Sequence, residues 1–366
     1  MITALHLKRL TPLFAGVVLF HNSHAQTMNG KIDKVDQYLQ KNYPASEPGL
    51  AIGLVADGKL VFKKGYGMAD LASTEKITPA TLFNIASMTK QFTGMAIRKL
   101  ADSGQISLSD TIGAYLPGLS PVIGSHITIA QLLSHQSGIP DHYNYVEAGT
   151  LKHAYDEQVL AAVKKMDSLS AAPGTRYHYS NTAFCLLGMV VEKRTGQLYA
   201  DYLKKELLLP AGMKHSFIWR EDRPIPVVAA GYDKSKNGFV RSGPDENVFF
   251  STEADGGLYT SVDDYLHWVQ YMLPQMPPAQ FMINAQSGLQ YGYGWFILKL
   301  ADKSLYLHSG SNGGFRSYVI VEPATHFALF LFSNRSDKNI EEQAQRVFEL
   351  LLPESGVLPL VQGMTN

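Results

Sequence analysis

Strand-like runs lie near both ends of this chain, and a long stretch of helical patterns separates them. Near the N-terminus, residues 49–55 and 60–66 are joined through Asp57-Gly58, a dipeptide typical of a two-residue hairpin turn. Three more β-rich runs lie near the C-terminus, at residues 304–308, 315–321 and 326–332. We therefore expect one antiparallel sheet that is built from both ends of the chain, with the helical stretch inserted between its strands.

This arrangement predicts an α/β fold of the α+β kind, with a single domain over residues 26–366. Its sheet part covers about residues 26–86 and 246–366, and its helical part covers about residues 87–245. Amphipathic runs near both ends predict helices that pack on the sheet, at residues 32–39 and about 340–352.

Residues 1–25 have the pattern of a secretory signal peptide. Lys8 and Arg9 precede an apolar run over residues 10–20, and a Ser-His-Ala sequence ends at Ala25. The apolar run is too short to span a bilayer, and no other uncharged stretch is long enough. We therefore expect cleavage near Ala25, a bacterial protein that is periplasmic or secreted, and no stable membrane insertion.

The charge balance and the cysteine content exclude several classes of function. The chain has 32 basic and 32 acidic residues, so it has no electrostatic footprint for nucleic acid. Cys185 is the single cysteine, which excludes disulfides within the chain, and no Cys/His cluster has zinc-ligand spacing. We therefore expect no nucleic-acid partner, no metal and no other cofactor.

Residues 84–93 have the pattern of a reactive serine at the start of a helix. Ser87 and Lys90 are three positions apart, so they share a helix face and the lysine amine can take the serine proton. The helix start adds a partial positive charge and free N–H groups that can face an oxyanion. Ser73 and Lys76 have the same spacing, but only Ser87 is followed by apolar residues at helical spacing. Ser87 is therefore the candidate nucleophile.

Two further motifs supply the other groups that acyl transfer needs. Tyr179 can move a proton to or from the serine and the leaving group, and Asn181 can orient a substrate amide. Residues 307–314 sit at the end of a predicted strand, where backbone N–H groups and hydroxyls can line an extended substrate. Asn181 could instead simply cap the helix that follows it.

Together these motifs resemble those of the serine penicillin-recognising enzymes, the family of class C β-lactamases, D-alanyl-D-alanine carboxypeptidases and related esterases. The resemblance rests on Ser-x-x-Lys at residues 87–90, Tyr-x-Asn at 179–181 and a His-Ser-Gly element at 308–310, and it covers nearly all of the chain after residue 25. Similar stretches also occur at residues 132–138, 209–213 and 256–259. The resemblance implies a β-lactamase/transpeptidase-like fold.

The resemblance also implies acyl transfer in two steps, with Ser87 attacking a carbonyl and Lys90 and Tyr179 sharing the role of base. The substrate-binding and oxyanion residues that it implies are Asn181, His308, Ser309, Gly310 and Ser311. Two arrangements of the base remain open. A cationic Lys90 would stabilise a Tyr179 phenolate, whereas burial could lower the lysine pKa enough to make Lys90 the base itself.

The expected substrate is a small molecule or a peptide, and peptidoglycan-derived compounds are among the candidates. The β-lactamases usually carry lysine where this chain has His308, and a carboxypeptidase needs a cation for a free carboxylate. No arginine occurs between Arg241 and Arg316. We therefore expect small esters or uncharged amides, including D-amino-acid peptides, to be preferred. The alternatives are a D-alanyl-D-alanine carboxypeptidase, a class C-like β-lactamase and a non-enzymatic penicillin-binding sensor of the cell wall.

Two features outside these motifs have simpler interpretations. His135 follows an apolar helical run, and we expect it to be a structural hydrogen-bonding residue. Tyr291, Tyr293 and Trp295 either line a pocket or pack in the core.

Overall fold

The computed structural model of the protein describes residues 24–351, except for residues 148, 150, 245, 277–282, 285–289 and 301–302. The predicted signal peptide lies outside the described residues apart from its last two positions. Among the described residues, no helix is both long enough and apolar enough to cross a membrane.

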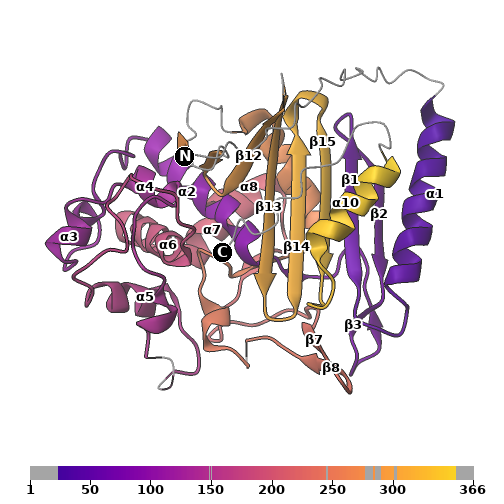
Figure 1. The fold of residues 1–366 in the computed structure, drawn as a ribbon, viewed down its shortest axis with the longest axis horizontal. Coiled ribbons are helices and arrows are strands. Elements are labelled where there is room, and N and C mark those ends of the chain that lie inside the picture. Colours follow the sequence, from indigo (N-terminus) through magenta and orange to yellow (C-terminus); the bar gives the residue numbers. More distant parts are fainter. Residues whose placement is uncertain are drawn as a thin grey trace, which may run out of the picture.

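The centre of the fold is an eight-stranded sheet in the order β10-β11-β12-β13-β14-β15-β1-β2, and every neighbouring pair is antiparallel (Figure 1). Its N-terminal strands are β1 (Leu50–Ala56) and β2 (Lys59–Tyr66), and the others are β10 (Ile283–Asn284), β11 (Gln290–Gly292), β12 (Trp295–Leu300), β13 (Lys303–Asn312), β14 (Phe315–Glu322) and β15 (Phe327–Ser333). Asp57 and Gly58 both have positive φ, as their hairpin turn requires. Since β1 pairs with β15, the prediction of one sheet from both chain ends is confirmed.

Helices cover both faces of this sheet. α10 (Ile340–Leu351) and α1 (His24–Asn42) pack together on one face, where Phe348 contacts Phe327 of β15. α9 (Val262–Met272) packs on the other face, where Tyr265 contacts Phe330 and Phe332. Side chains alternate between the faces of a strand, so β15 must be apolar on both sides, as its sequence is.

The helical part lies beside the β12 side of the sheet (Figure 1). It contains α2 (Lys90–Asp102), α3 (Pro121–Gly124), α4 (Ile129–Leu133), α5 (Asp156–Val163), α6 (Asn181–Thr195), α7 (Tyr199–Leu203), a π-helical turn (Lys204–Leu208) and α8 (Leu209–Ala211). α6 is at its centre and contacts α2, α4, α5 and α7. The Ser180 hydroxyl caps the start of α6, and Gly196 ends it in the left-handed conformation.

The prediction of helix as far as residue 245 is wrong beyond Ala211. That segment forms β6 (Phe217–Ile218) and a hairpin of β7 (Tyr232–Ser235) and β8 (Gly238–Arg241). β6 pairs with β9 (Leu258–Thr260), which also pairs with β5 (Phe83–Asn84). β6 is fixed by a partner far away in sequence, and β7 and β8 are only four residues long each, so none of them leaves a long periodic pattern to detect.

The remaining short elements are the strands β3 (Met68–Asp70) and β4 (Glu75–Lys76) and the 3-10 turns η1 (Ala86–Thr89), η2 (Ile112–Ala114), η3 (His142–Asn144), η6 (Val248–Ser251), η7 (Leu273–Gln275) and η9 (Pro323–Thr325).

Asn334, directly after β15, ties three distant segments together. Its side-chain oxygen accepts a hydrogen bond from Gly49 N–H at 2.7 Å, and its amide nitrogen donates to the carbonyl oxygens of Met68, Ala69 and Ala230 at 2.8–3.1 Å. Asn334 is fully buried, so these backbone groups have no access to water if the amide is removed.

Replacement of Asn334 by Ala should therefore lower the free energy of unfolding by about 3 kcal/mol, because buried donors and acceptors lose their partners. Urea unfolding at neutral pH measures this change. The exposed Asn237, in the turn between β7 and β8, provides the control, and Asn237→Ala should change stability by less than about 0.5 kcal/mol. Equal losses in the two variants would contradict the structural role of Asn334.

Candidate active site

Ser87 lies in the 3-10 turn η1, which connects β5 to the start of α2. Ala86, just before it, has a φ of +49°, an uncommon conformation for a residue other than glycine. The Asn84 side chain holds this turn, because it accepts a hydrogen bond from Ala86 N–H at 3.0 Å and donates one to the carbonyl oxygen of Gly256 at 3.1 Å. The serine is thus presented by a turn that its surroundings hold in place.

The amine of Lys90 connects three parts of the chain. Its Nζ lies 3.0 Å from Ser87 Oγ, 2.7 Å from Asn181 Oδ1 and 2.8 Å from the carbonyl oxygen of Asp255. An ammonium group has three N–H bonds, so these three acceptors use all of its donors. The side chain is fully buried, and burial lowers the pKa of Lys90, while the charge of Asp255 acts in the opposite direction.

Tyr179 lies against Lys90, with Nζ 5.0 Å from the centre of its ring. Burial raises the pKa of Tyr179, and the Ser87 hydroxyl acts in the opposite direction. Within the described residues, the buried Tyr179 hydroxyl makes no hydrogen bond of ordinary geometry. It is therefore free to exchange a proton with a bound substrate or with Ser87.

Asn181 is the first residue of α6, and the alternative that its side chain caps this helix is wrong. The helix cap is Ser180, whereas Asn181 uses its oxygen for Lys90 and donates from Nδ2 to Tyr143 Oη at 2.9 Å. Tyr143 was not identified from the sequence. Its ring is 44% exposed and packs edge-on against Phe249 at 5.0 Å, which gives the site an aromatic wall.

His135 packs against the ring of Tyr179 and binds the backbone of the next residue. Its Nδ1 accepts a hydrogen bond from Ser180 N–H at 3.1 Å, and its ring lies 4.2 Å from that of Tyr179. It is fully buried, in agreement with a structural role. Tyr291, Tyr293 and Trp295 are buried as well, which favours the core alternative for them over a pocket lining.

Strand β13 passes close to the serine turn, and Gly310 makes this approach possible. A Cβ atom at Gly310 would lie 2.4 Å from both Ile85 O and Ser317 Oγ, so any larger residue would push the strand away. The Ser317 hydroxyl also donates to Ile85 O at 2.7 Å. Ser309 is half-buried and Ser311 is exposed, so these two predicted substrate-binding residues are accessible on the strand that contacts the serine turn.

His308 is the predicted substrate-binding residue whose side chain is least accessible. Its ring is fully buried, with Nε2 3.1 Å from Tyr291 Oη and Nδ1 2.6 Å from the carbonyl oxygen of Ser309. Burial, together with the charge of Lys90, lowers the pKa of His308 to about 3. His308 is therefore a neutral residue that orients β13 and Tyr291, and it supplies no cation at neutral pH.

Gly294 and Asp255 are further residues of the site that sequence reasoning missed. Gly294 has a φ of +82°, and a Cβ there would lie 2.2 Å from the backbone carbon of Lys90, so the turn before β12 packs on the first turn of α2. The Tyr-Gly-Tyr-Gly sequence at residues 291–294 was a visible signal for a tight turn. No local signal marked Asp255.

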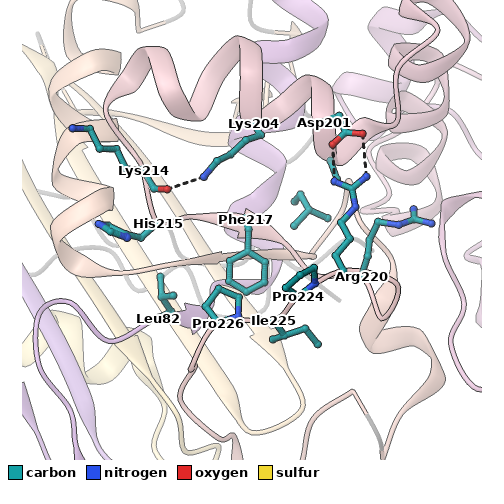
Figure 2. Close-up of a pocket in the computed structure, with 13 residues that line it drawn as sticks. Leu82, Asp201, Lys204, Lys214, His215, Phe217, Arg220, Pro224, Ile225 and Pro226 are labelled. Atoms are coloured by element: carbon teal, nitrogen blue, oxygen red, sulfur yellow. Dashed lines mark hydrogen bonds and ion pairs between the residues drawn. The ribbon is translucent and has the colours of Figure 1, made fainter.

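Two cavities of the described structure lie away from this site. Figure 2 shows one of about 370 Å³ next to α7 and β6, and another of about 330 Å³ lies near Trp219. In the first, Lys204 donates to the carbonyl oxygen of Lys214 and Arg223 pairs with both oxygens of Asp201. Neither cavity is lined by Ser87, Lys90 or Tyr179.

The burial of neutral His308 predicts a specific loss of stability in acid. The unfolded chain takes up a proton at this residue below a pH of about 6.5, whereas the folded protein does so only near pH 3. His308 should therefore lower the free energy of unfolding by about 1.4 kcal/mol for each pH unit between these values. In His308→Asn this contribution should vanish, so wild type should lose about 2 kcal/mol more than the variant from pH 7 to pH 5.

Urea unfolding at the two pH values measures this difference. The exposed His126 serves as the control, and His126→Asn should keep the pH dependence of the wild type. An unchanged pH dependence in His308→Asn would mean that folding does not lower the pKa of this ring.

Comparison with known proteins places this site in a family. The Beta-lactamase family model matches residues 35–352. "Protein flp" of Staphylococcus aureus (strain N315) is 30% identical over 334 residues, which cover 87% of this chain and 65% of flp, so the chain spans less than two thirds of that relative. The N-acetylmuramyl-L-alanine amidase of Bacillus subtilis (strain 168) is 25% identical over 89% of this chain and 86% of its own length.

Among solved structures, the octameric penicillin-binding protein homologue from Pyrococcus abyssi superposes with a TM-score of 0.75 at 29% identity, over 89% of this chain and 77% of its own. The expected β-lactamase/transpeptidase-like fold is thereby confirmed. With a matching family model over most of its length, the chain belongs to the beta-lactamase family of serine hydrolases.

Proposed function

We propose that this protein is a secreted or periplasmic enzyme that transfers the acyl group of small esters or uncharged amides to Ser87 and then to water. One observation carries the choice of substrate. Among the described residues, Lys90 is the one cation that contacts Ser87, Tyr179 or Asn181, and all three of its donors are already used. The site therefore has no obvious partner for a fixed carboxylate on the substrate.

In the first step, Ser87 Oγ forms a bond to the substrate carbonyl carbon. Its proton passes to Lys90 Nζ, which lies 3.0 Å away, or to Tyr179 Oη. Burial lowers the pKa of Lys90, so the ammonium can lose a proton before the attack and the amine can then accept the proton of Ser87. As the tetrahedral intermediate collapses, the proton moves to the departing alcohol or amine, and the acyl group remains on Ser87.

In the second step, water attacks the acyl carbon and gives its proton to the same base. Ser87 Oγ departs with a proton, and the carboxylic acid product leaves. The oxyanion of both steps would be held by the backbone N–H groups of Ser87 and Ser311, which the approach of β13 to the serine turn favours. Asn181 would hold the substrate carbonyl or amide group beside Tyr143.

The distribution of cations disfavours a carboxypeptidase or a β-lactamase. His308 is neutral and buried where the β-lactamases usually have lysine. Arg316 follows the site on β14, but its guanidinium donates to the carbonyl oxygens of Gly313 and Phe315. Residues 277–282 and 285–289, which lie outside the described residues, contain no lysine or arginine.

The Bacillus subtilis relative is named an N-acetylmuramyl-L-alanine amidase, which supports amides as a natural substrate class of this protein. D-amino-acid peptides remain the second candidate, because the serine hydroxyls of Ser309 and Ser311 offer a neutral way to hold a carboxylate. A non-catalytic sensor that binds its ligand without acylation would need none of the proton-transfer groups that surround Ser87.

A fluorophosphonate probe should label Ser87 of the wild type, and Ser87→Ala should abolish both labelling and ester turnover. In Lys90→Met, which keeps the stem of the side chain, labelling should be slower by about 10²–10⁴-fold because the proton acceptor is missing. Ser73→Ala is the control and should label normally. A peptide map of protein from the periplasmic fraction locates the label and shows whether the chain starts near Gln26. Label on Ser73, or turnover by Ser87→Ala, would refute the assignment.

The substrate class can be tested by comparing kcat/KM for p-nitrophenyl butyrate, nitrocefin, a diacyl-D-Ala-D-Ala peptide and the same peptide as its C-terminal amide. We expect the butyrate ester to be best and the peptide amide to exceed the peptide acid, because only the acid brings an unpaired carboxylate into the site. A preference for the peptide acid would make carboxypeptidase the leading function, and a preference for nitrocefin would favour β-lactamase.

A further inference from the structure

A buried carboxyl group lies beside Lys90 and has no role in the acyl transfer described above. Asp255 belongs to the segment between η6 and β9. Leu258, at the start of β9, binds the serine turn through two hydrogen bonds: its N–H donates to Thr89 Oγ1 at 3.1 Å, and its carbonyl oxygen accepts from Ile85 N–H at 3.0 Å. The carbonyl oxygen of Asp255 already binds Lys90 Nζ. Any change at Asp255 is therefore transmitted directly to the lysine.

The Asp255 side chain is only 5% exposed, and within the described residues its Oδ1 has no hydrogen-bond donor. A carboxylate in such a place is costly unless a cation is near it. The charge of Asp255 is the largest influence that opposes the effect of burial on Lys90. Lys90, whose amine binds the carbonyl oxygen of the same residue, is therefore the cation that we take as the counter-charge of this carboxylate.

Two neighbours of Asp255 could share its charge, but both favour their neutral forms. An oxygen of Asp156, the sulfur of Cys185 and an oxygen of Asp255 lie within 4.8 Å of one another. Burial raises the pKa of Asp156 well above its usual range, and burial likewise raises the pKa of the Cys185 thiol. Asp156 is further used by the N–H groups of Glu253 and Ala254, which donate to its two oxygens.

We propose that Asp255 is a positioning residue of this enzyme, whose buried carboxylate is the counter-charge of the Lys90 ammonium that lies between Ser87 and Asn181. This proposal rests on acyl transfer at Ser87. It assigns to Asp255 a side-chain role in addition to its backbone contact: the carboxylate sets the pH at which Lys90 gives up its proton, and thus the pH range in which the serine is activated.

The other groups that face Lys90 do not replace this charge. The titratable and charged groups around the amine are Tyr179, Cys185, His135, His142, His308, Asp141, Asp156 and Asp255. Burial lowers the pKa of all three histidines, which keeps them neutral. Asp141 is occupied by the Ser180 hydroxyl and by Thr182 at the start of α6.

The test is the pH dependence of fluorophosphonate labelling at Ser87, which needs no knowledge of the natural substrate. The labelling rate of the wild type is first plotted against pH and compared with that of Lys90→Met. The part of the wild-type curve that rises because Lys90 loses its proton is missing in this variant, and it is called the limb below. In Asp255→Asn, this limb should move to lower pH by about one unit or more, because an opposite charge near a buried amine favours its protonated form. At a fixed pH on the limb, the labelling rate then changes about tenfold. Asp255→Ala should give the same shift.

Asp264→Asn is the matched control, since Asp264 is a buried carboxylate that binds His215 N–H and the N–H and hydroxyl of Ser216. It should lower the melting temperature without moving the limb. Folded Asp255 variants with a wild-type limb would overturn the proposal, as would failure of both to fold, which would make Asp255 purely structural. A wild type that does not label at Ser87 would instead overturn the proposed function.

Discussion

The buried amine of Lys90 is the interaction on which the rest of the site depends. It joins the serine turn to the start of α6 and to the segment before β9. Its partners there, Asn181 and Asp255, are 91 and 165 residues away from the lysine along the chain. Removing a charged amine from water is costly, so three acceptors and the carboxylate of Asp255 must be in place together. The same burial makes the amine a competent base, which links the packing of the two halves of the molecule to the reactivity of Ser87.

The sheet and the helical part each supply what the other lacks. The helical part provides Lys90, Tyr179 and Asn181, whereas the sheet provides the edge of β13 against which a substrate can lie. Glycine permits both close approaches between them, at Gly310 over the serine turn and at Gly294 over the first turn of α2. A side chain at either position would separate the nucleophile from its binding edge.

The charges around Ser87 explain the proposed preference better than the motifs do. The histidine of the His-Ser-Gly element could in principle carry a positive charge, but burial keeps His308 neutral. The one lysine of the site is held by protein acceptors and balanced by a buried carboxylate. A site with this balance favours neutral acyl groups, and the exposed ring of Tyr143 offers them an apolar surface.

The sequence by itself determined the features that rest on local signals. The Asp57-Gly58 turn, a helix near each chain end and the pairing of strands from both ends are present as predicted, and the structure brings Ser87, Lys90, Tyr179 and Asn181 together. Only the tertiary structure decided the roles of Tyr143 and Asp255, the pairing of β6 with β9, and the neutral state of His308. Each depends on burial and on contacts between distant segments, and no local pattern encodes these.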